Sequence, residues 1–365
     1  MYTAEQKRNR HRRFWQPLEK GEGAYIAVQS PIDDTGTQIG RFSPAVSKEE
    51  NLLDVSRCVE RAEATVAGTY FGLDAIHSHF INFGPGVQAA FFGAPYTITD
   101  NSVWFDLNPP IKSWDPMPDL KMNREHELYK ATEAQTRALC AASKGRYAVS
   151  YTDIGGQYDI LFSLRGEDLF MDMLDCPETV LAAEDKLDAA FIEYFNTLTD
   201  IIRPAGLGFT NWMPVVSDVP WYPIQCDMSV MLSPKQFERF VLPSLDRVSA
   251  AIGQTIYHLD GPEEIRHLDM LLSLKYVNAI QWVPLPTLAL PGGGYTQNFA
   301  DKMSLDIYRH AKAAGKKIML YGVRAEQIQT IFNAVGRDGI FIYTYCGTRK
   351  DADALVEHAE RNWVR

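Results

Sequence analysis

The sequence predicts an α/β protein, a (β/α)8 TIM barrel with an N-terminal helical extension and long loops at the carboxyl ends of its strands. Strand and helix patterns alternate through the C-terminal part of the chain, which implies parallel strands joined by right-handed crossovers. Strand patterns begin near residues 24, 74, 146, 207, 254, 277, 317 and 339, the number that such a barrel needs. The 365 residues, 46% of them hydrophobic, can bury one large core. We therefore predict a single domain over 1–365, with 1–23 as the extension.

The N-terminal half has the less regular pattern. Its first strand is predicted over 24–30, and residues 84–125, rich in Pro, Asn and aromatic residues, are predicted to form a long excursion or lid. Residues 166–202 read as two helices broken near Asp175-Cys176-Pro177. Further strands are predicted over 74–83, 146–151 and 207–214, helices over 53–70 and 127–142, and a loop at the carboxyl face over 215–232.

The C-terminal half has clear start signals. Ser233 is a good N-cap and Pro234 a good first helical residue, and Phe237, Phe240 and Val241 follow at helical spacing. The apolar periodicity then predicts strands over 254–258, 277–283, 317–321 and 339–345, a Pro/Gly loop over 284–296, and helices over 263–274, 304–314, 325–335 and 351–363.

Composition limits the partners and the compartment. The formal net charge of −10 argues against nucleic acid or an anionic membrane as the main partner. One basic cluster, residues 7–13, favours a solvated first helix; the alternative is a patch for an anionic ligand or a neighbouring subunit. Five cysteines without close spacing predict a reduced compartment. No apolar run has transmembrane length and the start is not a signal peptide, so a cytoplasmic protein is expected.

Two soft-metal ligands follow predicted strands that lie far apart in the sequence. His258-Leu259-Asp260-Gly261 closes the strand 254–258, and Cys346-Gly347 closes the strand 339–345. The carboxyl ends of parallel strands open into one cleft, so the imidazole and the thiol are expected to meet there. Asp260 faces the same way as His258 in extended chain. Such a set suits zinc with one open coordination position.

Each of these residues also has a structural reading. A histidine at a strand end is often a satisfied core residue, and free cysteine often packs as a small hydrophobe. Cys226 or Asp227 in the loop 215–232 could supply a further ligand, although Cys226 reads slightly better as an ordinary loop residue.

Other candidate site residues lie near predicted strand ends. Asp74 could be a carboxylate acting as an acid/base group, or simply the start of a strand. Aromatic residues could line a site for a flat or quaternary ammonium ligand, although packing at the mouth of the barrel is favoured. These aromatic residues are Trp212, Trp221, Tyr222, Trp282 and Tyr295.

Taken together, these motifs resemble the uroporphyrinogen decarboxylase superfamily. Asp227, Leu232-Ser233-Pro234 and Leu242-Pro243 are similar to one stretch of that superfamily, and His258 with Gly261 to its strand-end His-x-x-Gly. Gln281-Trp282, Leu320-Tyr321-Gly322 and Cys346-Gly347 are similar to three later motifs, and Asp74 lies roughly where the decarboxylases carry their catalytic Asp. The resemblance implies a TIM barrel.

The resemblance is closer to one branch of that superfamily than to the other. The true decarboxylases have an arginine-rich segment for a substrate with eight carboxylates, whereas this chain has Asp33-Asp34 there. Without these arginines several charged hydrogen bonds to the substrate are lost, each worth about 1.5–3 kcal/mol, so that substrate would bind much more weakly. Cys346-Gly347 is similar instead to the zinc-dependent methyltransferases, which use His-x-Cys and a distant Cys as ligands; here Asp260 stands in place of the first Cys.

The resemblance thus implies a zinc-dependent methyltransferase of corrinoid-linked one-carbon metabolism. His258, Asp260, Cys346 and Cys226 are the candidate zinc ligands, Asp74 and His258 the candidate catalytic residues, and Asp33 with the aromatic residues the candidate substrate pocket. The methyl group would move between a small substrate and a corrinoid protein, and the chain could form a homodimer. The alternatives are a decarboxylase-like lyase that uses Asp74 and His258 on a smaller carboxylated substrate, and a non-catalytic binding protein.

Overall fold

The fold is built on one large, mostly parallel sheet. The computed structural model describes residues 2–33, 47–100, 102–106, 108–290 and 293–364. Its seven-stranded sheet has the order β2-β1-β13-β12-β9-β8-β7, in which β2 alone pairs antiparallel. These strands are β1 (Tyr25–Pro31), β2 (Thr69–Leu73), β7 (Tyr222–Ile224), β8 (Thr255–Asp260), β9 (Val277–Val283), β12 (Lys317–Tyr321) and β13 (Ile340–Tyr345).

A smaller parallel sheet stands beside the edge formed by β7. β3 (Ser78–His79) pairs with β6 (Ala148–Val149), and an isolated parallel bridge joins Ser150 to Thr210. The Tyr222 hydroxyl reaches across from β7: it accepts from the main-chain nitrogen of Ile154 (2.6 Å) and donates to the oxygen of Thr152 (3.1 Å). The pairings of the described residues thus give a mixed α/β fold with a largely parallel sheet, and they do not establish a closed ring.

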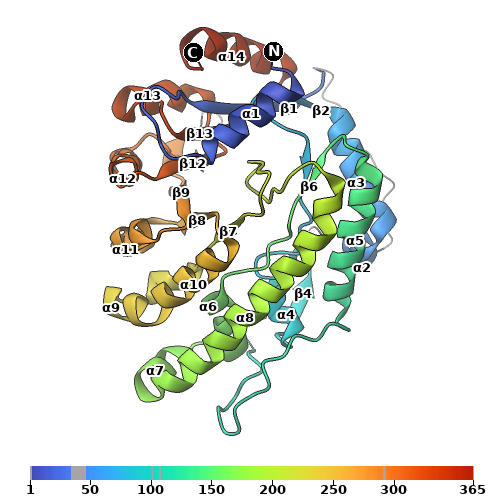
Figure 1. Cartoon of the computed structure of the whole chain (residues 1–365), viewed down its shortest axis with the longest axis vertical. Coiled ribbons are helices and arrows are strands. Elements are labelled where there is room, and N and C mark those ends of the chain that lie inside the picture. The colour runs from blue at the N-terminus through green and yellow to red at the C-terminus, as the bar shows by residue number, and fades with distance from the viewer. Residues whose placement is uncertain (1, 34–46, 101, 107, 291–292, 365) are drawn as a thin grey trace.

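Helices surround the strands, with α10 to α14 along one side and α3, α5 and α8 along another (Figure 1). The longer helices are α1 (Ala4–Phe14), α3 (Val55–Gly68), α5 (Glu127–Ser143), α6 (Gln157–Arg165), α7 (Asp168–Asp175), α8 (Pro177–Ile202), α10 (Leu242–Ile252), α12 (Lys302–Ala313), α13 (Ala325–Val335) and α14 (Arg349–Asn362). The shorter ones are α2 (Lys48–Leu53), α4 (Gln88–Phe91), α9 (Pro234–Gln236) and α11 (Leu268–Ser273). None of the described helices combines the length and the hydropathy that a membrane span needs.

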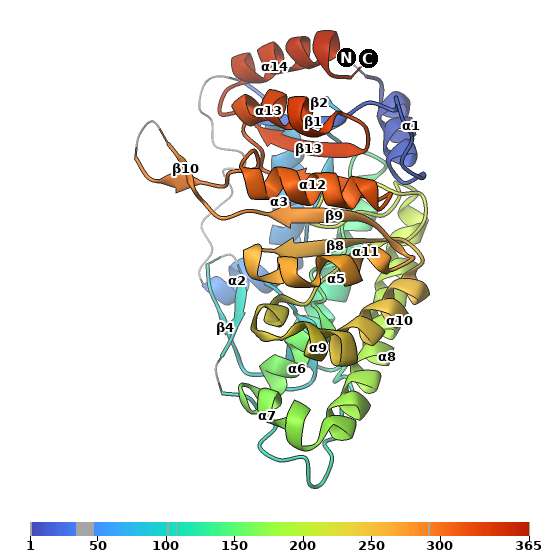
Figure 2. The same cartoon turned by 90° about the vertical axis from the view of Figure 1, so that its left-hand side faces the viewer.

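Helix α1 and the hairpin formed by β10 (Leu288–Ala289) and β11 (Tyr295–Thr296) lie at opposite ends of the strands. In Figure 2 the arrowheads of β8, β9 and β13 point toward the hairpin, while α1 lies at the amino ends. A buried ion pair between Lys317 at the start of β12 and Glu22 (2.9 Å) helps to fix the segment after α1, and the Lys317 ammonium also donates to the Arg13 oxygen. The N-terminal segment therefore covers the amino face and leaves the carboxyl face open.

The sequence prediction is wrong in detail in the N-terminal half. Residues 74–83 do not form one strand: β2 ends at Leu73, whose φ of 49° turns the chain, and β3 follows after a break. Residues 207–214 make only bridges, and the loop over 215–232 contains β7. The helix predicted over 53–70 is present as α3, which begins after its N-cap Asp54 and ends at Gly68, where β2 follows. Helix α6 and the hairpin of β4 (Tyr96–Ile98) with β5 (Val103–Phe105) were not predicted.

Candidate metal centre

A group of three metal-ligating side chains lies at the carboxyl ends of β7 and β8. One ligand atom each from Asp227, His258 and Asp260 lies within 4.8 Å of the other two. His258 and Asp260 are two residues apart in β8, so their side chains leave the strand on the same face. Asp227 begins the short 3-10 helix Asp227–Met231 that follows β7, the neighbour of β8 in the sheet. Adjacent parallel strands thus bring the three groups together.

Helix α6 holds Asp227 in position. The Asp159 carboxylate accepts from the main-chain nitrogen of Asp227 (3.0 Å) and from that of Met228 (2.8 Å). The start of α6 lies close to the main chain before Asp227: a Cβ on Gly156 would lie 2.4 Å from both Asp159 Oδ2 and the Gln225 oxygen. The Asp227 side chain is left free for another partner: its Oδ1 is buried, with no hydrogen bond from any described residue. A buried carboxylate oxygen without a partner is costly unless a cation or a proton occupies the site.

Gln281 orients the imidazole of His258. The two residues are register partners on β8 and β9, and the Gln281 Oε1 atom lies within hydrogen-bonding distance of His258 Nδ1. Because the amide oxygen only accepts, Nδ1 carries a proton in this contact, so Nε2 is the ring nitrogen that could offer a lone pair to a metal. The Trp212 ring packs edge-on against the imidazole, with centroids 6.2 Å apart. Gln281 and Trp212 therefore fix the orientation of the His258 ring, as the groups around a metal-binding histidine do.

Removing the Gln281 amide should weaken metal binding. In a Gln281→Leu variant the His258 ring loses the partner that fixes its tautomer and orientation, and we expect about 10–100-fold weaker affinity, measured by competition with a chromophoric chelator. Asn278→Leu is the matched control, because Asn278 lies in the same strand and its side chain accepts from the main-chain nitrogen of Thr255 at the amino end of the sheet. Equal affinities for the two variants would contradict the role given to Gln281.

Further carboxyl groups surround the three ligands. Burial, followed by the nearby Asp227 charge, raises the pKa of Asp153 to about 7 and that of Glu264 to about 10. Burial also raises the pKa of Asp227. The His258 imidazole acts in the opposite direction and lowers this pKa, while the Asp260 charge raises it. Glu264 accepts from the main-chain nitrogen of Asp260 (3.3 Å) through one oxygen, while its other oxygen is buried with no hydrogen bond from the described residues. The raised pKa values mean that these crowded carboxyl groups resist ionising together, and a bound cation would favour their ionised forms.

The metal-free protein should become less stable relative to a Glu264→Gln variant as the pH rises. The folded-state pKa of Glu264, about 10, is above its usual 4.5, so the folded state keeps a proton that the unfolded state releases. The contribution of protonated Glu264 to the free energy of unfolding is fully present below about pH 4.5 and is lost as the pH rises toward 10. Urea unfolding of chelator-treated protein from pH 4 to pH 9 measures this difference. Glu263→Gln is the control, since Glu263 is exposed; parallel pH curves for parent and Glu264→Gln would contradict the assignment.

A largely apolar cleft of about 340 Å³ adjoins Asp227, one of the three metal ligands. Asp159 and Asp227 form part of its wall, and Gly86 and Gly155 bring the main chain close to it. The remaining lining is mostly aromatic and thioether: Trp104, Phe105, Phe162, Met228 and Met231. A cleft with few polar groups next to a metal ligand suits a small substrate that carries an apolar group.

The predicted ligands are brought together only in part. His258 and Asp260 lie side by side as expected, and of the two candidates in the loop 215–232 it is Asp227 that joins them. Cys226 is buried next to Asp227, and burial raises the pKa of its thiol. Cys346 follows β13, which β12 and β9 separate from β8. Neither cysteine belongs to the three-residue group, so the prediction that they bind the metal stays a prediction.

Asp74 lies at the other end of the sheet. It follows β2, the antiparallel strand, and its carboxylate binds the Arg10 guanidinium (2.5 and 3.0 Å) and the main-chain nitrogen of Ile26 (2.7 Å). Its own main-chain oxygen accepts from His11 Nε2 (2.7 Å), so Asp74 anchors helix α1. The structure does not bring Asp74 to the metal ligands.

Most of the predicted substrate-binding aromatic residues pack in the core. Trp221 is fully buried against Trp15 and donates to the Phe209 oxygen, and Trp282 donates to the Ser304 hydroxyl. Tyr222 uses its hydroxyl to join β7 to the smaller sheet. Trp212 alone contacts His258. Tyr295 in the hairpin is 69% exposed, Asp33 is exposed after β1, and Asp34 lies outside the described residues.

Sequence reasoning missed Asp159, Gln281 and Glu264 as functional residues. Gln281 had a usable signal, because it stands in the strand next to His258 at the same predicted depth. Asp159 had a weaker one, the Asp153-Ile-Gly-Gly-Gln157 run, since paired glycines after a strand indicate close approach of the main chain. Glu264 gave no signal that separates it from exposed Glu263.

Comparison with known proteins supports the fold. Neither a protein-family model nor a curated protein matches the sequence. Seven chains of solved structures match, among them a methyltransferase from Methanosarcina mazei with a TM-score of 0.59 and 12% sequence identity. The match covers 97% of this chain and 98% of that one. At this identity the likeness concerns the fold: the chain has the α/β architecture of that methyltransferase over nearly its whole length.

Proposed function

We propose that this protein is a metal-dependent methyltransferase. Asp227, His258 and Asp260 would hold zinc, and a methyl group would move between a small substrate and a corrinoid carried by a partner protein. The observation that carries the proposal is the three-ligand group beside an apolar cleft, at the carboxyl ends of the sheet. The full-length likeness in fold to a methyltransferase supports the reaction class.

The donor set fits a catalytic rather than a structural zinc site. Catalytic zinc sites use three protein ligands from His, Asp, Glu and Cys, and keep the fourth position open for water or substrate. The unpartnered Asp227 Oδ1 gives the ion a ready carboxylate, and because Gln281 occupies His258 Nδ1, Nε2 is the nitrogen that would bind the ion. Two carboxylates and an imidazole bind other first-row divalent cations too, so the metal is named by analogy with the superfamily that the sequence resembles. When bound, zinc would act as a Lewis acid on the group that gives or accepts the methyl.

The residues around the ligands have separate tasks. Asp159 holds the turn that carries Asp227, and Gln281 holds the His258 ring. The apolar wall of the cleft, including Trp104, Phe105 and Met231, would exclude water from the substrate and accept its apolar part. Cys346, which follows β13, would be a further ligand.

A corrinoid protein would dock over the carboxyl ends of the strands. Large apolar side chains are exposed by 44–69% on segments at or beyond these ends. They are Ile32, Trp104, Met231, Leu285, Tyr295, Tyr321 and Tyr345. Single exposed apolar residues are common, but Trp104 and Met231 line the cleft itself, and exposed apolar residues at a cleft are typical of an interaction surface. A docked partner there would enclose the cleft and deliver its cofactor to the metal ligands.

The proposal is tested by metal analysis joined to a methyl-transfer assay. Protein purified without chelator should carry close to one zinc per chain, and chelator should lower its melting temperature. The metal-loaded protein should also demethylate free methylcobalamin in the presence of small thiols, which the absorbance spectrum of the corrinoid reports. Absence of bound metal together with unchanged stability on adding chelator would overturn the metal site. Bound metal without any methyl transfer would favour a binding protein.

A further inference from the structure

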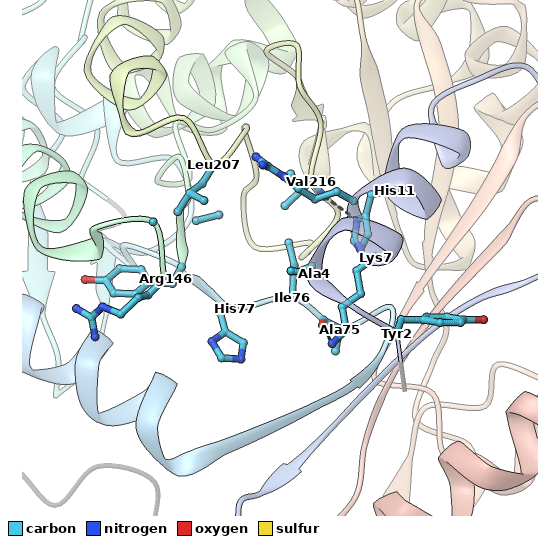
Figure 3. Close-up of a pocket in the computed structure, with 14 residues that line it drawn as sticks. Tyr2, Ala4, Lys7, His11, Ala75, Ile76, His77, Arg146, Leu207 and Val216 are labelled. Carbon is cyan, nitrogen blue, oxygen red and sulfur yellow. Dashed lines mark hydrogen bonds between the residues drawn. The ribbon is translucent and has the colours of Figure 1, made fainter.

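A second cavity, of about 390 Å³, lies at the amino ends of the strands, away from the metal ligands. Its walls come from helix α1, from the segment that joins β2 to β3, from residues just before β6, and from Leu207 and Val216. Figure 3 shows His77 between Lys7 on one side and Arg146 on the other. None of the three candidate metal ligands lines this cavity.

The charged side chains that line this cavity all carry the same sign. They are Lys7, Arg8 and Arg146, joined by the imidazoles of His11 and His77, and the lining contains no Asp or Glu. The whole chain has a net charge of −10, so a lining with only basic groups departs from its average. Lys7 and Arg8 belong to the basic cluster over residues 7–13, which the sequence alone left between a solvated helix and an anion patch.

The structure divides that basic cluster into paired and unpaired charges. Arg10 binds Asp74 and Arg12 binds Asp218, so carboxylates balance these two. The Lys7 ammonium instead donates to the main-chain oxygens of Phe71 and Ala75 (2.8 Å each), and Arg8 donates to the Gly206 oxygen (3.0 Å). No carboxylate among the described residues forms an ion pair with Lys7 or Arg8. Their neutral partners fix the two cations at the cavity without a salt bridge. Burial lowers the pKa of Lys7, and the nearby Asp74 charge raises it. Both cations have N–H groups beyond those used in these bonds.

The rest of the cavity wall is apolar. Ala4, Ile76, Leu207 and Val216 form one part of it, and the rings of Tyr2 and Tyr147 another. Arg146 is less available than Lys7 and Arg8, because it forms a two-bond ion pair with Glu63 (2.5 and 2.6 Å). The cavity therefore offers two cationic groups on α1 and an apolar floor opposite them.

We propose that this cavity is a binding site for a small organic anion. The carboxylate or phosphate of the ligand would face Lys7 and Arg8, and its apolar part would lie against Ile76, Leu207 and Val216. Charged hydrogen bonds supply the attraction, and burial of the apolar part adds to it. The site is independent of the methyl-transfer proposal, since the cavity and the metal ligands lie at opposite ends of the strands.

Benzoate is a suitable probe, with benzamide as its uncharged analogue. Saturation-transfer NMR and calorimetry on the full chain should detect millimolar benzoate binding that weakens as salt rises, and at least tenfold weaker binding of benzamide. Arg8→Gln should weaken benzoate binding about tenfold, because one charged hydrogen bond is lost. Arg12→Gln is the matched control: it removes the same charge from the same helix, but outside the cavity and from an exposed pair, and should leave binding unchanged.

Three results would overturn the proposal. They are no benzoate binding to the parent protein, equal binding of benzoate and benzamide, and equal weakening by Arg8→Gln and Arg12→Gln. Circular dichroism and melting temperature without benzoate check that the two variants remain folded, and a double variant of Lys7→Met with Arg8→Gln should lose binding altogether. Metal content should be the same in all of them, which separates failure of this proposal from failure of the metal centre.

Discussion

Replacing His258 with alanine should remove the bound metal. His258 supplies the only nitrogen in the three-ligand group, and its loss leaves two carboxylates that repel each other. Zinc sites in proteins are worth about 10–16 kcal/mol in all, so loss of one of three ligands should weaken affinity roughly a thousandfold or more. Metal content after gel filtration, measured by plasma emission, tests this. His310→Ala is the control, since His310 lies on α12, partly exposed and paired with Asp269.

Asp227→Asn should raise the melting temperature of the metal-free protein and lower that of the zinc-bound protein. In the metal-free protein this variant removes a buried negative charge from a cluster that already has too many, so the melting temperature should rise. In the presence of zinc the same variant should be less stable than the parent, because it loses a ligand. A lower melting temperature in both states would mean that Asp227 has a structural role unrelated to metal.

Cys346→Ala completes this series. If the metal is held by the three residues alone, this variant keeps its zinc; if Cys346 is a further ligand, zinc is lost as in His258→Ala.

The sequence predicted a shared site for the imidazole and the thiol from the rule that parallel strands end at one face. The structure supports that rule for Asp227 and His258, which come from neighbouring strands.

The sequence predicts the second half of the fold better than the first because its signals there are local and repeated. The strands β8, β9, β12 and β13 are largely apolar runs between amphipathic helices, and each begins within one residue of its predicted start. Strand β7 has only three residues and includes Pro223, so no periodicity reveals it. Asp227 depends on β7 for its position, and for that reason its role could only be suggested.

The sequence pattern also does not show whether a strand runs parallel or antiparallel to its neighbours in the sheet. Asp74 is a candidate catalytic residue in the sequence because it lies roughly where the decarboxylases carry their catalytic Asp. In the structure the preceding strand β2 runs antiparallel to β1, and this brings Asp74 to the amino end of the sheet beside Ile26. Likewise, Gln281 and Trp282 are adjacent in β9, yet alternation turns Gln281 toward His258 and Trp282 toward Ser304 on α12. Only the pairing of strands decides which of two neighbours enters the site.

Asp74→Asn should therefore destabilise the protein without changing its metal. The Asp74 side chain is completely buried, and its charge balances Arg10, which is itself mostly buried. Removing one partner of such a pair leaves the other charge uncompensated, at a cost of about 3–5 kcal/mol in the free energy of unfolding. Urea unfolding measures this loss, and zinc content should equal that of the parent. Asp218→Asn is the control, because Asp218 pairs with Arg12 where both are about half exposed, and should cost less than about 1 kcal/mol. If Asp74→Asn had normal stability but no methyl-transfer activity, the result would support the catalytic role that the sequence suggested for Asp74.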